Sequence, residues 1–295
     1  MKQAQRIIGA CIRALREQRG LSLEALAAKA AISYQYLSGV ETGKENFSVQ
    51  VLESLARALD VQVQVLIIAA YEGIAQASVP RLEARFFRPS TPLPLGLKIQ
   101  HIDAAANLAQ SIIYRINRNL RQEIGQPLQA LIQGNNFSGL VSNVLTNAFD
   151  QCSPYKHNHD QRYPDLIYAE GAPGGVGLEV KTTINVGKGG ESHNGHGGWH
   201  LVGCYRFLET GDIQFIHLMF AQLNGHQHEQ PDWSYLGSRV NATTGSRRTE
   251  TYTTTLTGTT KLRDGSVYLD TRSVNPSRWR QARDGEIPAW SIFAE

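Results

Sequence analysis

The chain has 295 residues with a formal net charge of +3, and 41% of its residues are hydrophobic. This length allows about two domains, and this composition supports packed cores and excludes global disorder. No apolar run reaches the ~18 residues of a membrane span, which excludes a protein anchored by a spanning helix. The arginine-broken, amphipathic N-terminus lacks the pattern of a secretory signal peptide.

The cysteines indicate a reducing compartment. Cys11, Cys152 and Cys204 are scattered without CxxC spacing, which argues against a disulfide framework and a cysteine zinc site. Cys204 stands in an apolar run and is expected to be buried. We therefore expect a cytoplasmic protein with no membrane partner and no nucleotide cofactor.

Residues 1–73 have the pattern of a small helical domain. Ser22, Ser33 and Ser48 each precede a short stretch with apolar residues at helical spacing, as N-cap residues do. Gly43 follows the second of these stretches and suits a positive φ at the end of a helix. Two short helices joined by a tight turn and braced on both sides predict a helix-turn-helix.

Residues 21–61, LSLEALAAKAAISYQYLSGVETGKENFSVQVLESLARALDV, closely resemble the Cro/repressor-like (XRE) family. The resemblance covers nearly all of residues 4–62 and implies that the second helix of the motif enters the DNA major groove. Gln35 is the best base-reading candidate, because Gln can form two hydrogen bonds with adenine. A helical bundle used for dimerisation or protein contact is the alternative. The resemblance implies these DNA-binding residues: Ser33 as the cap, Tyr34, Gln35 and Ser38 in the groove, and Lys44 and Asn46 on phosphate.

Residues 74–100 are rich in proline and predict a semi-extended connector between two domains. Phe86 and Phe87 in this segment are expected to lie against a domain surface. Two helices are predicted after it, over residues 103–123 and 138–152, because apolar residues recur there at helical spacing.

The stretch YPDLIYAEGAPGGVGLEVKTT, residues 163–183, predicts two strands joined by a glycine-rich turn. Alternation along the second strand places Glu179 and Lys181 on one face and Val180 toward the core. Strand pairing can bring Asp165 close to Glu179. Two carboxylates and the Val180 carbonyl offer the hard oxygen ligands that Mg²⁺ prefers, and such a metal ion activates water for phosphodiester hydrolysis. A surface Asp beside a Glu–Lys ion pair is the alternative.

The letters PD…EVK in this stretch resemble the signature of the PD-(D/E)xK nucleases. The resemblance implies a restriction-endonuclease-like α/β core over residues 101–295, with a mixed sheet flanked by helices. It implies Asp165 and Glu179 as Mg²⁺ ligands and catalytic residues, Val180 as a carbonyl ligand and Lys181 as the catalytic lysine. The family often adds an acid from the preceding helix, where this chain offers Asp150.

Residues 184–200, INVGKGGESHNGHGGWH, predict a flexible loop that orders around DNA. Nine Lys or Arg stand against three Asp or Glu between Arg239 and Arg283, which suits either a phosphate backbone or a solvated basic surface. The loop residues expected to contact DNA are Lys188, His193, Asn194 and His196.

Two further hairpins are expected. Residues 199–223 read as two β-rich runs around Thr210-Gly211-Asp212, although the first run could instead be a crossover helix. TKLRDGSVYLD, residues 260–270, predicts a final hairpin that turns at Asp264-Gly265.

Together these patterns predict a sequence-specific, Mg²⁺-dependent double-strand DNA endonuclease that resembles type II restriction enzymes. A homodimer is expected, because two chains related by a two-fold axis can cut both strands. One alternative is a transcriptional repressor or autoregulator whose C-terminal domain dimerises or senses. The other is a nuclease specific for nicked, branched or modified DNA.

Overall fold

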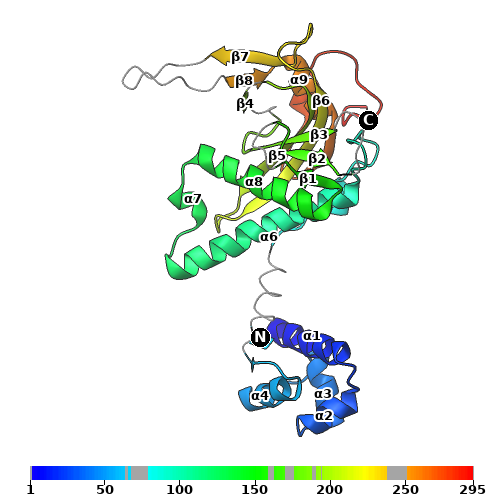
Figure 1. The fold of residues 1–295 in the computed structure, drawn as a ribbon, viewed down its shortest axis with the longest axis vertical. Helices are drawn as coiled ribbons and strands as arrows, with labels where there is room; N and C mark the ends of the chain where they lie inside the picture. The colour runs from blue at the N-terminus through cyan, green and yellow to red at the C-terminus, as the bar shows by residue number, and fades with distance from the viewer. Residues whose placement is uncertain are drawn as a thin grey trace. The chain divides into compact units, whose positions relative to one another are not determined.

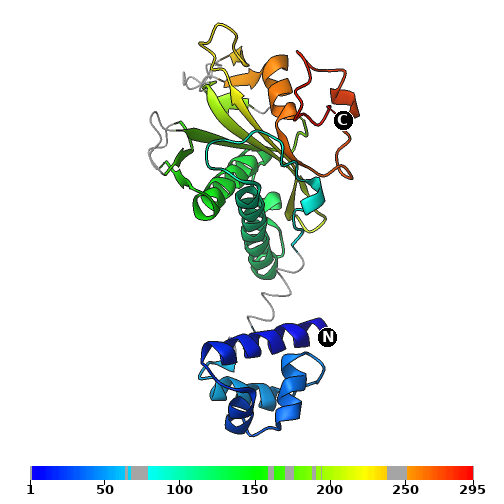
Figure 2. The same ribbon diagram turned by 90° about the vertical axis from the view of Figure 1, so that its right-hand side faces the viewer.

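The computed structural model describes residues 2–63, 66–67, 79–158, 163–169, 176–187, 191–193, 195–237 and 251–294. The chain divides into two compact units, Met1–Val79 and Pro80–Glu295 (Figures 1 and 2). The buried hydrophobic residues form separate clusters, one in the first unit and three in the second. Within the described chain, none of the helices combines the length and the apolarity that a bilayer span requires.

The first unit is helical, as predicted, and its N-caps are the predicted serines. The hydroxyls of Ser22, Ser33 and Ser48 accept hydrogen bonds from backbone N–H groups three residues ahead, at 3.1, 3.2 and 3.3 Å. Gly43 has the predicted positive φ, +69°. The core between the helices contains Leu37, which is 0% exposed. The helices are α1 (Lys2–Gln18), α2 (Leu23–Lys29), α3 (Tyr34–Glu41) and α4 (Val49–Ala58).

The second unit contains a six-stranded mixed sheet in the order β1-β2-β3-β5-β6-β9. β3 and β5 are parallel, and the other neighbours are antiparallel. A second, antiparallel sheet has the order β4-β8-β7. The strands are β1 (Tyr155–His157), β2 (Leu166–Tyr168), β3 (Gly177–Thr183), β4 (Glu191–His193), β5 (Gly198–Phe207), β6 (Ile213–Leu223), β7 (Trp233–Gly237), β8 (Thr251–Thr254) and β9 (Ser266–Leu269).

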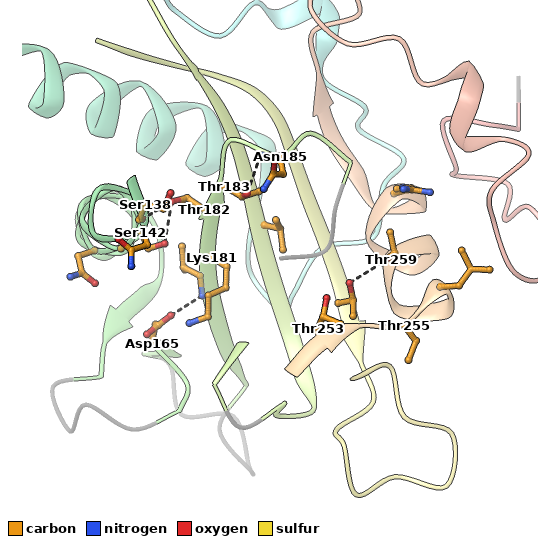
Figure 3. Close-up of a pocket in the computed structure, with 18 residues that line it drawn as sticks. Ser138, Ser142, Asp165, Lys181, Thr182, Thr183, Asn185, Thr253, Thr255 and Thr259 are labelled. Carbon is orange, nitrogen blue, oxygen red and sulfur yellow. Dashed lines mark hydrogen bonds between the residues drawn. The ribbon is translucent and has the colours of Figure 1, made fainter. Parts of the chain in front are cut away.

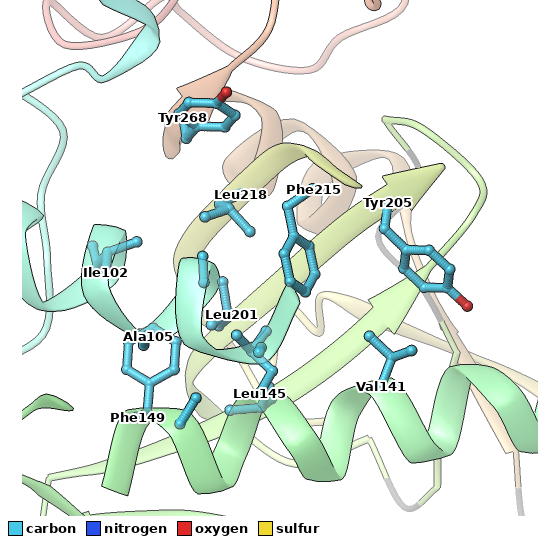
Figure 4. Packing of buried hydrophobic residues seen from close by; sticks show 14 of the residues in the cluster. Ile102, Ala105, Val141, Leu145, Phe149, Leu201, Tyr205, Phe215, Leu218 and Tyr268 are labelled. Atoms are coloured by element: carbon cyan, nitrogen blue, oxygen red, sulfur yellow. The ribbon is translucent and has the colours of Figure 1, made fainter. Parts of the chain in front are cut away.

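Helices α6 and α8 cover one face of the large sheet and enclose its main core. Both predicted helices are present, each beginning four residues earlier than predicted. Val141, Leu145 and Phe149 of α8 pack with Leu201 and Phe215 of the sheet, and all five are at most 1% exposed (Figure 4). The helical segments of this unit are η1 (Ala84–Phe86), α6 (Ile99–Glu123), α7 (Leu128–Leu131), α8 (Gly134–Cys152), α9 (Leu256–Asp264) and η2 (Ser277–Trp279).

The other face of the large sheet packs against the small sheet and α9. Val202 and Cys204 of β5 share a cluster with Trp233 of β7, Tyr252 of β8 and Leu262 of α9. Burial raises the pKa of the Cys204 thiol to about 12. Cys204 is thus the buried residue that the sequence predicts.

The predicted hairpin over residues 199–223 is confirmed, because β5 and β6 pair antiparallel around Thr210-Gly211-Asp212. The predicted hairpin at Asp264-Gly265 is wrong, because the residues before the turn form helix α9. The Thr255 hydroxyl starts that helix by accepting from Gly258 N at 3.1 Å. Leu262 then turns into the core.

The proline-rich segment from Pro80 onward packs as part of the second unit. Leu82 and Leu97 lie in its main core, and the rings of Phe86 and Phe87 contact Tyr268, in line with the expectation that they lie on a domain surface. The predicted loop 184–200 contains β4, and β5 begins within it at Gly198. Periodicity misses these elements because β4 is three residues long and glycines surround it.

Candidate functional site

Helix α3 presents a polar face away from the core of the first unit. Tyr34 is 46% exposed, Gln35 is exposed and Ser38 is half-buried. Leu37 and Val40 face the opposite way and are fully buried. The helix therefore has the two faces that a DNA-reading helix needs, one for packing and one for contact.

The loop after α3 holds the two residues predicted to contact phosphate. Lys44 is exposed. Asn46 is also exposed, but its side-chain oxygen accepts a hydrogen bond from Gln5 and its carbonyl accepts one from the Tyr36 hydroxyl at 2.6 Å. Asn46 is thus held in place by protein contacts, and Tyr36 serves packing.

A buried ion pair that no sequence pattern predicted fixes the end of α3. Arg16 of α1 donates to both carboxylate oxygens of Glu41, at 2.7 and 2.9 Å, and to the Leu21 carbonyl at 3.0 Å. The hydrogen bond that Arg16 donates to the Glu41 carboxylate raises the pKa of Arg16. Such a bidentate pair restricts the orientation of both helices. The sequence features that could have predicted this ion pair are a Glu at the last position of α3 and an Arg on the facing side of α1.

In the second unit, the structure brings Asp165, Glu179 and Lys181 together. The register pairs Leu166 with Leu178, so Asp165, which directly precedes β2, lies beside Glu179 of β3. The Val180 N–H donates to the Asp165 carboxylate at 2.8 Å. The predicted juxtaposition of these residues is confirmed, while their catalytic and metal-binding roles stay predictions.

The carboxylates of this cluster are incompletely satisfied. Lys181 Nζ lies 2.5 Å from Glu179 Oε1. Glu179 is 8% exposed, and its Oε2 is buried without a hydrogen-bond partner among the described residues. Burial, and next the charge of Glu179, raise the pKa of Asp165. Buried polar atoms normally have partners, so an orphaned oxygen beside a second acid indicates a position for a ligand.

Aromatic and imidazole rings pack next to the carboxylates. His200 pairs with Glu179 across β3 and β5 and is 1% exposed. Its Nδ1 lies 3.0 Å from the Gly198 carbonyl, while its Nε2 is buried without a partner among the described residues. Burial lowers the pKa of His200 to about 4. Tyr163 stacks on His196 and has its pKa raised to about 12, mainly by burial.

The other residues predicted to contact DNA lie outside the described residues or pack against other side chains. Lys188 and Asn194 lie outside the described residues, and for His193 only the backbone in β4 is described. His196 is half-buried against Tyr163, with ring centroids 4.5 Å apart. The acid at the end of α8, Asp150, accepts from the His157 N–H at 2.9 Å and so supports β1. Within the described part of the chain, no three His, Cys, Asp or Glu side chains converge as a metal site.

Comparison with known proteins identifies the first unit. A family described as a helix-turn-helix domain matches residues 7–66. The transcriptional regulator SinR of Bacillus subtilis is 39% identical over 67 residues, which are 22% of this chain and 60% of SinR. The regulator DdrOP3 of Deinococcus deserti is 43% identical over 56 residues, which are 19% of this chain and 43% of DdrOP3. The chain thus spans about half the length of these relatives.

Among solved structures, the restriction-modification controller protein C.AhdI from Aeromonas hydrophila is 37% identical. The similarity covers 21% of this chain and 94% of that protein, with a TM-score of 0.21. SinR in complex with DNA is 41% identical and covers 20% of this chain and 97% of that one, with a TM-score of 0.20.

These relatives correct the predicted function. The curated relatives are named as transcriptional regulators, so the prediction of a type II-like double-strand endonuclease is wrong and the regulator alternative is favoured. The caps, the turn and the buried stripes on which that alternative depends are all present in the first unit. Residues 7–66 are a helix-turn-helix domain.

Proposed function

We propose that this protein is a transcriptional regulator that binds duplex DNA through α3. The observation that carries the proposal is the exposed polar face of α3, set by the buried Leu37 and Val40 on a helix-turn-helix whose relatives are named as regulators. Tyr34 and Gln35 supply side chains that can reach base edges, and Lys44 supplies a charge for phosphate.

The first test is a mobility-shift titration of the full chain on the promoter of its own gene, with unrelated duplex DNA as competitor. We expect Gln35→Ala to weaken specific binding about tenfold, because a bidentate contact to adenine contributes about 1–3 kcal/mol of discrimination. Gln100→Ala is the matched control, because Gln100 is an exposed glutamine on α6 of the other unit. Equal affinities for promoter and competitor would count against the proposal.

We also propose a homodimer as the DNA-bound species. Helix-turn-helix proteins commonly place two recognition helices one helical turn of DNA apart, so a pseudo-palindromic operator mirrors the two-fold axis of the protein. Light scattering of the protein–operator complex gives the number of chains. A complex with a single chain on an asymmetric site would contradict the dimer.

A second candidate activity, metal-dependent hydrolysis of a phosphodiester, is favoured by one observation. Glu179 Oε2 is a buried carboxylate oxygen without a partner among the described residues, and it belongs to a cluster with Asp165 and Lys181. We propose that the mixed sheet of this unit is a restriction-endonuclease-like core. This proposal does not extend to sequence-specific double-strand cleavage.

The donor set fits Mg²⁺, which prefers oxygen ligands and usually retains several waters. Asp165, Glu179 and the Val180 carbonyl would hold the ion, which would supply charge stabilisation and an activated water when bound. The Val180 N–H orients Asp165 through its 2.8 Å hydrogen bond. As a cation, Lys181 offsets the negative charge of Glu179 from 2.5 Å and would orient an attacking water by donating a hydrogen bond to it.

Calorimetric titration with Mn²⁺ tests the binding site without relying on turnover, and bis-p-nitrophenyl phosphate tests hydrolysis. We expect heat of binding in the wild type and in Lys181→Met, none in Glu179→Ala, and hydrolysis in the wild type alone. Equal Mn²⁺ binding by the wild type and Glu179→Ala would leave the cluster as a structural ion pair.

A further inference from the structure

A polar cleft of about 840 Å³ opens beside the carboxylate cluster of the second unit. Asp165 and Lys181 lie on one side of it, and Thr253, Thr255 and Thr259 lie on the other (Figure 3). Eleven of its eighteen lining residues are Ser, Thr or Asn. Hydroxyl and amide groups at this density suit a ligand rich in hydrogen-bond acceptors.

One cation in the lining of the cleft, Arg263, has no counter-charge among the described residues. Its charged lining residues are Asp165, Lys181 and Arg263. Arg263 donates to the carbonyls of Gly187 and Ala282, at 2.8 and 2.9 Å, and has no carboxylate partner among the described residues. Burial, and next the charge of Arg278, lower the pKa of Arg263. A bound anion would supply the counter-charge that this guanidinium lacks.

Three donor groups of the lining are free within the described protein. The side chains of Asn143 on α8, Asn185 after β3 and Thr253 on β8 have no protein hydrogen-bond partner there. They come from three different elements, so the free donors are spread along the cleft. By contrast, Thr182 is occupied by the Ser138 carbonyl at 2.8 Å.

We infer that this cleft binds a single phosphodiester strand of nucleic acid, with Arg263 and Thr253 on one phosphate and Asn143 and Asn185 on its neighbours. Phosphate oxygens accept hydrogen bonds from these side-chain types in protein–nucleic acid complexes. The described lining contains no aromatic residue on which a base could stack, so the backbone is what the cleft contacts. A mononucleotide site would be more apolar. The inference rests on the phosphodiester specificity proposed for the same site, but binding itself requires neither a metal ion nor the helix-turn-helix.

The test measures the affinity of the full chain for fluorescein-labelled dT12 in EDTA by fluorescence anisotropy, over a series of salt concentrations. We expect Arg263→Gln to weaken binding at least tenfold, because a charged hydrogen bond is lost. The slope of log K against log salt should fall by about 0.7, the value for one phosphate contact on a single strand. Arg280→Gln, an exposed arginine outside the cleft, should change neither quantity.

Because Arg263 also stacks on Trp279, its replacement can disturb folding. The double variant Thr253→Val, Asn185→Ala removes two free donors while leaving Arg263 in place, and should weaken dT12 binding about fivefold. Unchanged affinity in both cleft variants would overturn the inference. So would loss of dT12 binding in Gln35→Ala, which would assign strand binding to α3, or equally tight binding of thymidine monophosphate. Promoter binding is measured separately, so failure of the regulator proposal is distinguishable.

Discussion

The Arg16–Glu41 pair of the first unit and the Asp165–Glu179–Lys181 cluster of the second unit differ in how completely their charges are satisfied. In the first unit, Arg16 and Glu41 satisfy each other with two short hydrogen bonds, and the residues proposed to read DNA stand on an exposed surface. In the second unit, Glu179 keeps an unpartnered buried oxygen and Asp165 has a raised pKa. A surface site can act on a fully satisfied core, whereas a half-buried site carries unsatisfied groups that a ligand completes.

The units also differ in their titratable groups. All nine histidines belong to the second unit. Two of them, His200 and His217, are at most 1% exposed, and burial lowers their pKa values to about 4 and about 3. Protonation of either imidazole therefore lowers the stability of the second unit, and the first unit has no histidine that could have this effect.

The largest expected effects come from matched core deletions. Leu37 in α3 and Leu145 in α8 are both 0% exposed, so replacing either with Ala should lower the free energy of unfolding by about 2–5 kcal/mol. Because the two residues belong to separate clusters, each change should lower the thermal transition of its own unit only. Calorimetry of the full chain measures both transitions. Leu95→Ala, at 52% exposed, is the control, and a joint shift of both transitions would contradict separate cores.

The next largest expected effect is a difference in acid sensitivity between the two units. The folded pKa of His200, about 4, lies below the unfolded value of about 6.5. The unfolded state then binds more protons between these values, so stability falls as pH drops from 6.5 to 4, by about 3 kcal/mol for this residue. We expect His200→Gln to reduce the acid sensitivity of the second unit, measured by urea unfolding at pH 7 and pH 4.5. The control variant His228→Gln replaces an exposed histidine and should leave the acid sensitivity of the second unit unchanged. A first unit that loses as much stability in acid would contradict this difference between the units.

The sequence predicts the first unit well because each of its signals is local. Caps, turn and apolar stripes lie within a few residues of one another, and Ser22, Ser33 and Ser48 all cap as expected. In the second unit, PD…EVK correctly indicates that Asp165 and Glu179 are neighbours, because a short hairpin also has local register.

The remaining sequence patterns do not predict the structure correctly, because packing between residues distant in sequence determines it. β8 and α9 build the far wall of the cleft, and residues 260–264 resemble a strand in sequence yet form a helix. The Thr255 cap and the burial of Leu262 decide that outcome, and both depend on a sheet that is distant in sequence. His200 and Arg263 could not be assigned because their importance comes from contacts that no spacing encodes.

A smaller effect on stability is expected at Asp165, one of the two carboxylates in the cluster of the second unit. The raised pKa of Asp165 means that its charge opposes folding at neutral pH. Asp165→Asn should therefore raise the melting temperature of the second unit at pH 8, and this gain should shrink as pH falls through the raised pKa and the wild-type residue becomes protonated.

Binding of Mg²⁺ at the proposed site should stabilise the second unit, which is opposite to the effect of the Asp165 charge alone. Mg²⁺ at a hundredfold excess over its Kd should stabilise the wild-type second unit by about 2.7 kcal/mol, and EDTA should reverse this. Asp165→Asn should lose the response, whereas the first unit should show none in either protein. Thermal unfolding with Mg²⁺ and with EDTA measures both. Two results would contradict the proposed difference between the units. One is an Asp165→Asn variant whose second unit melts below that of the wild type at pH 8. The other is an equal stabilisation of both units by Mg²⁺.

The smallest effect compares one helix cap in each unit. The Ser33 hydroxyl accepts from Tyr36 N at 3.2 Å and the Thr255 hydroxyl accepts from Gly258 N at 3.1 Å, so each change to Ala should cost about 1 kcal/mol in its own unit. Their functional consequences should differ: Ser33→Ala frays the first turn of α3 and should weaken promoter binding, while Thr255→Ala should weaken dT12 binding and leave promoter binding intact. Titrations with both DNA probes, beside calorimetry, measure these four outcomes. Since the stability losses are nearly equal, a difference in binding reports where each helix acts, and loss of promoter binding in Thr255→Ala would mean that the units do not act separately.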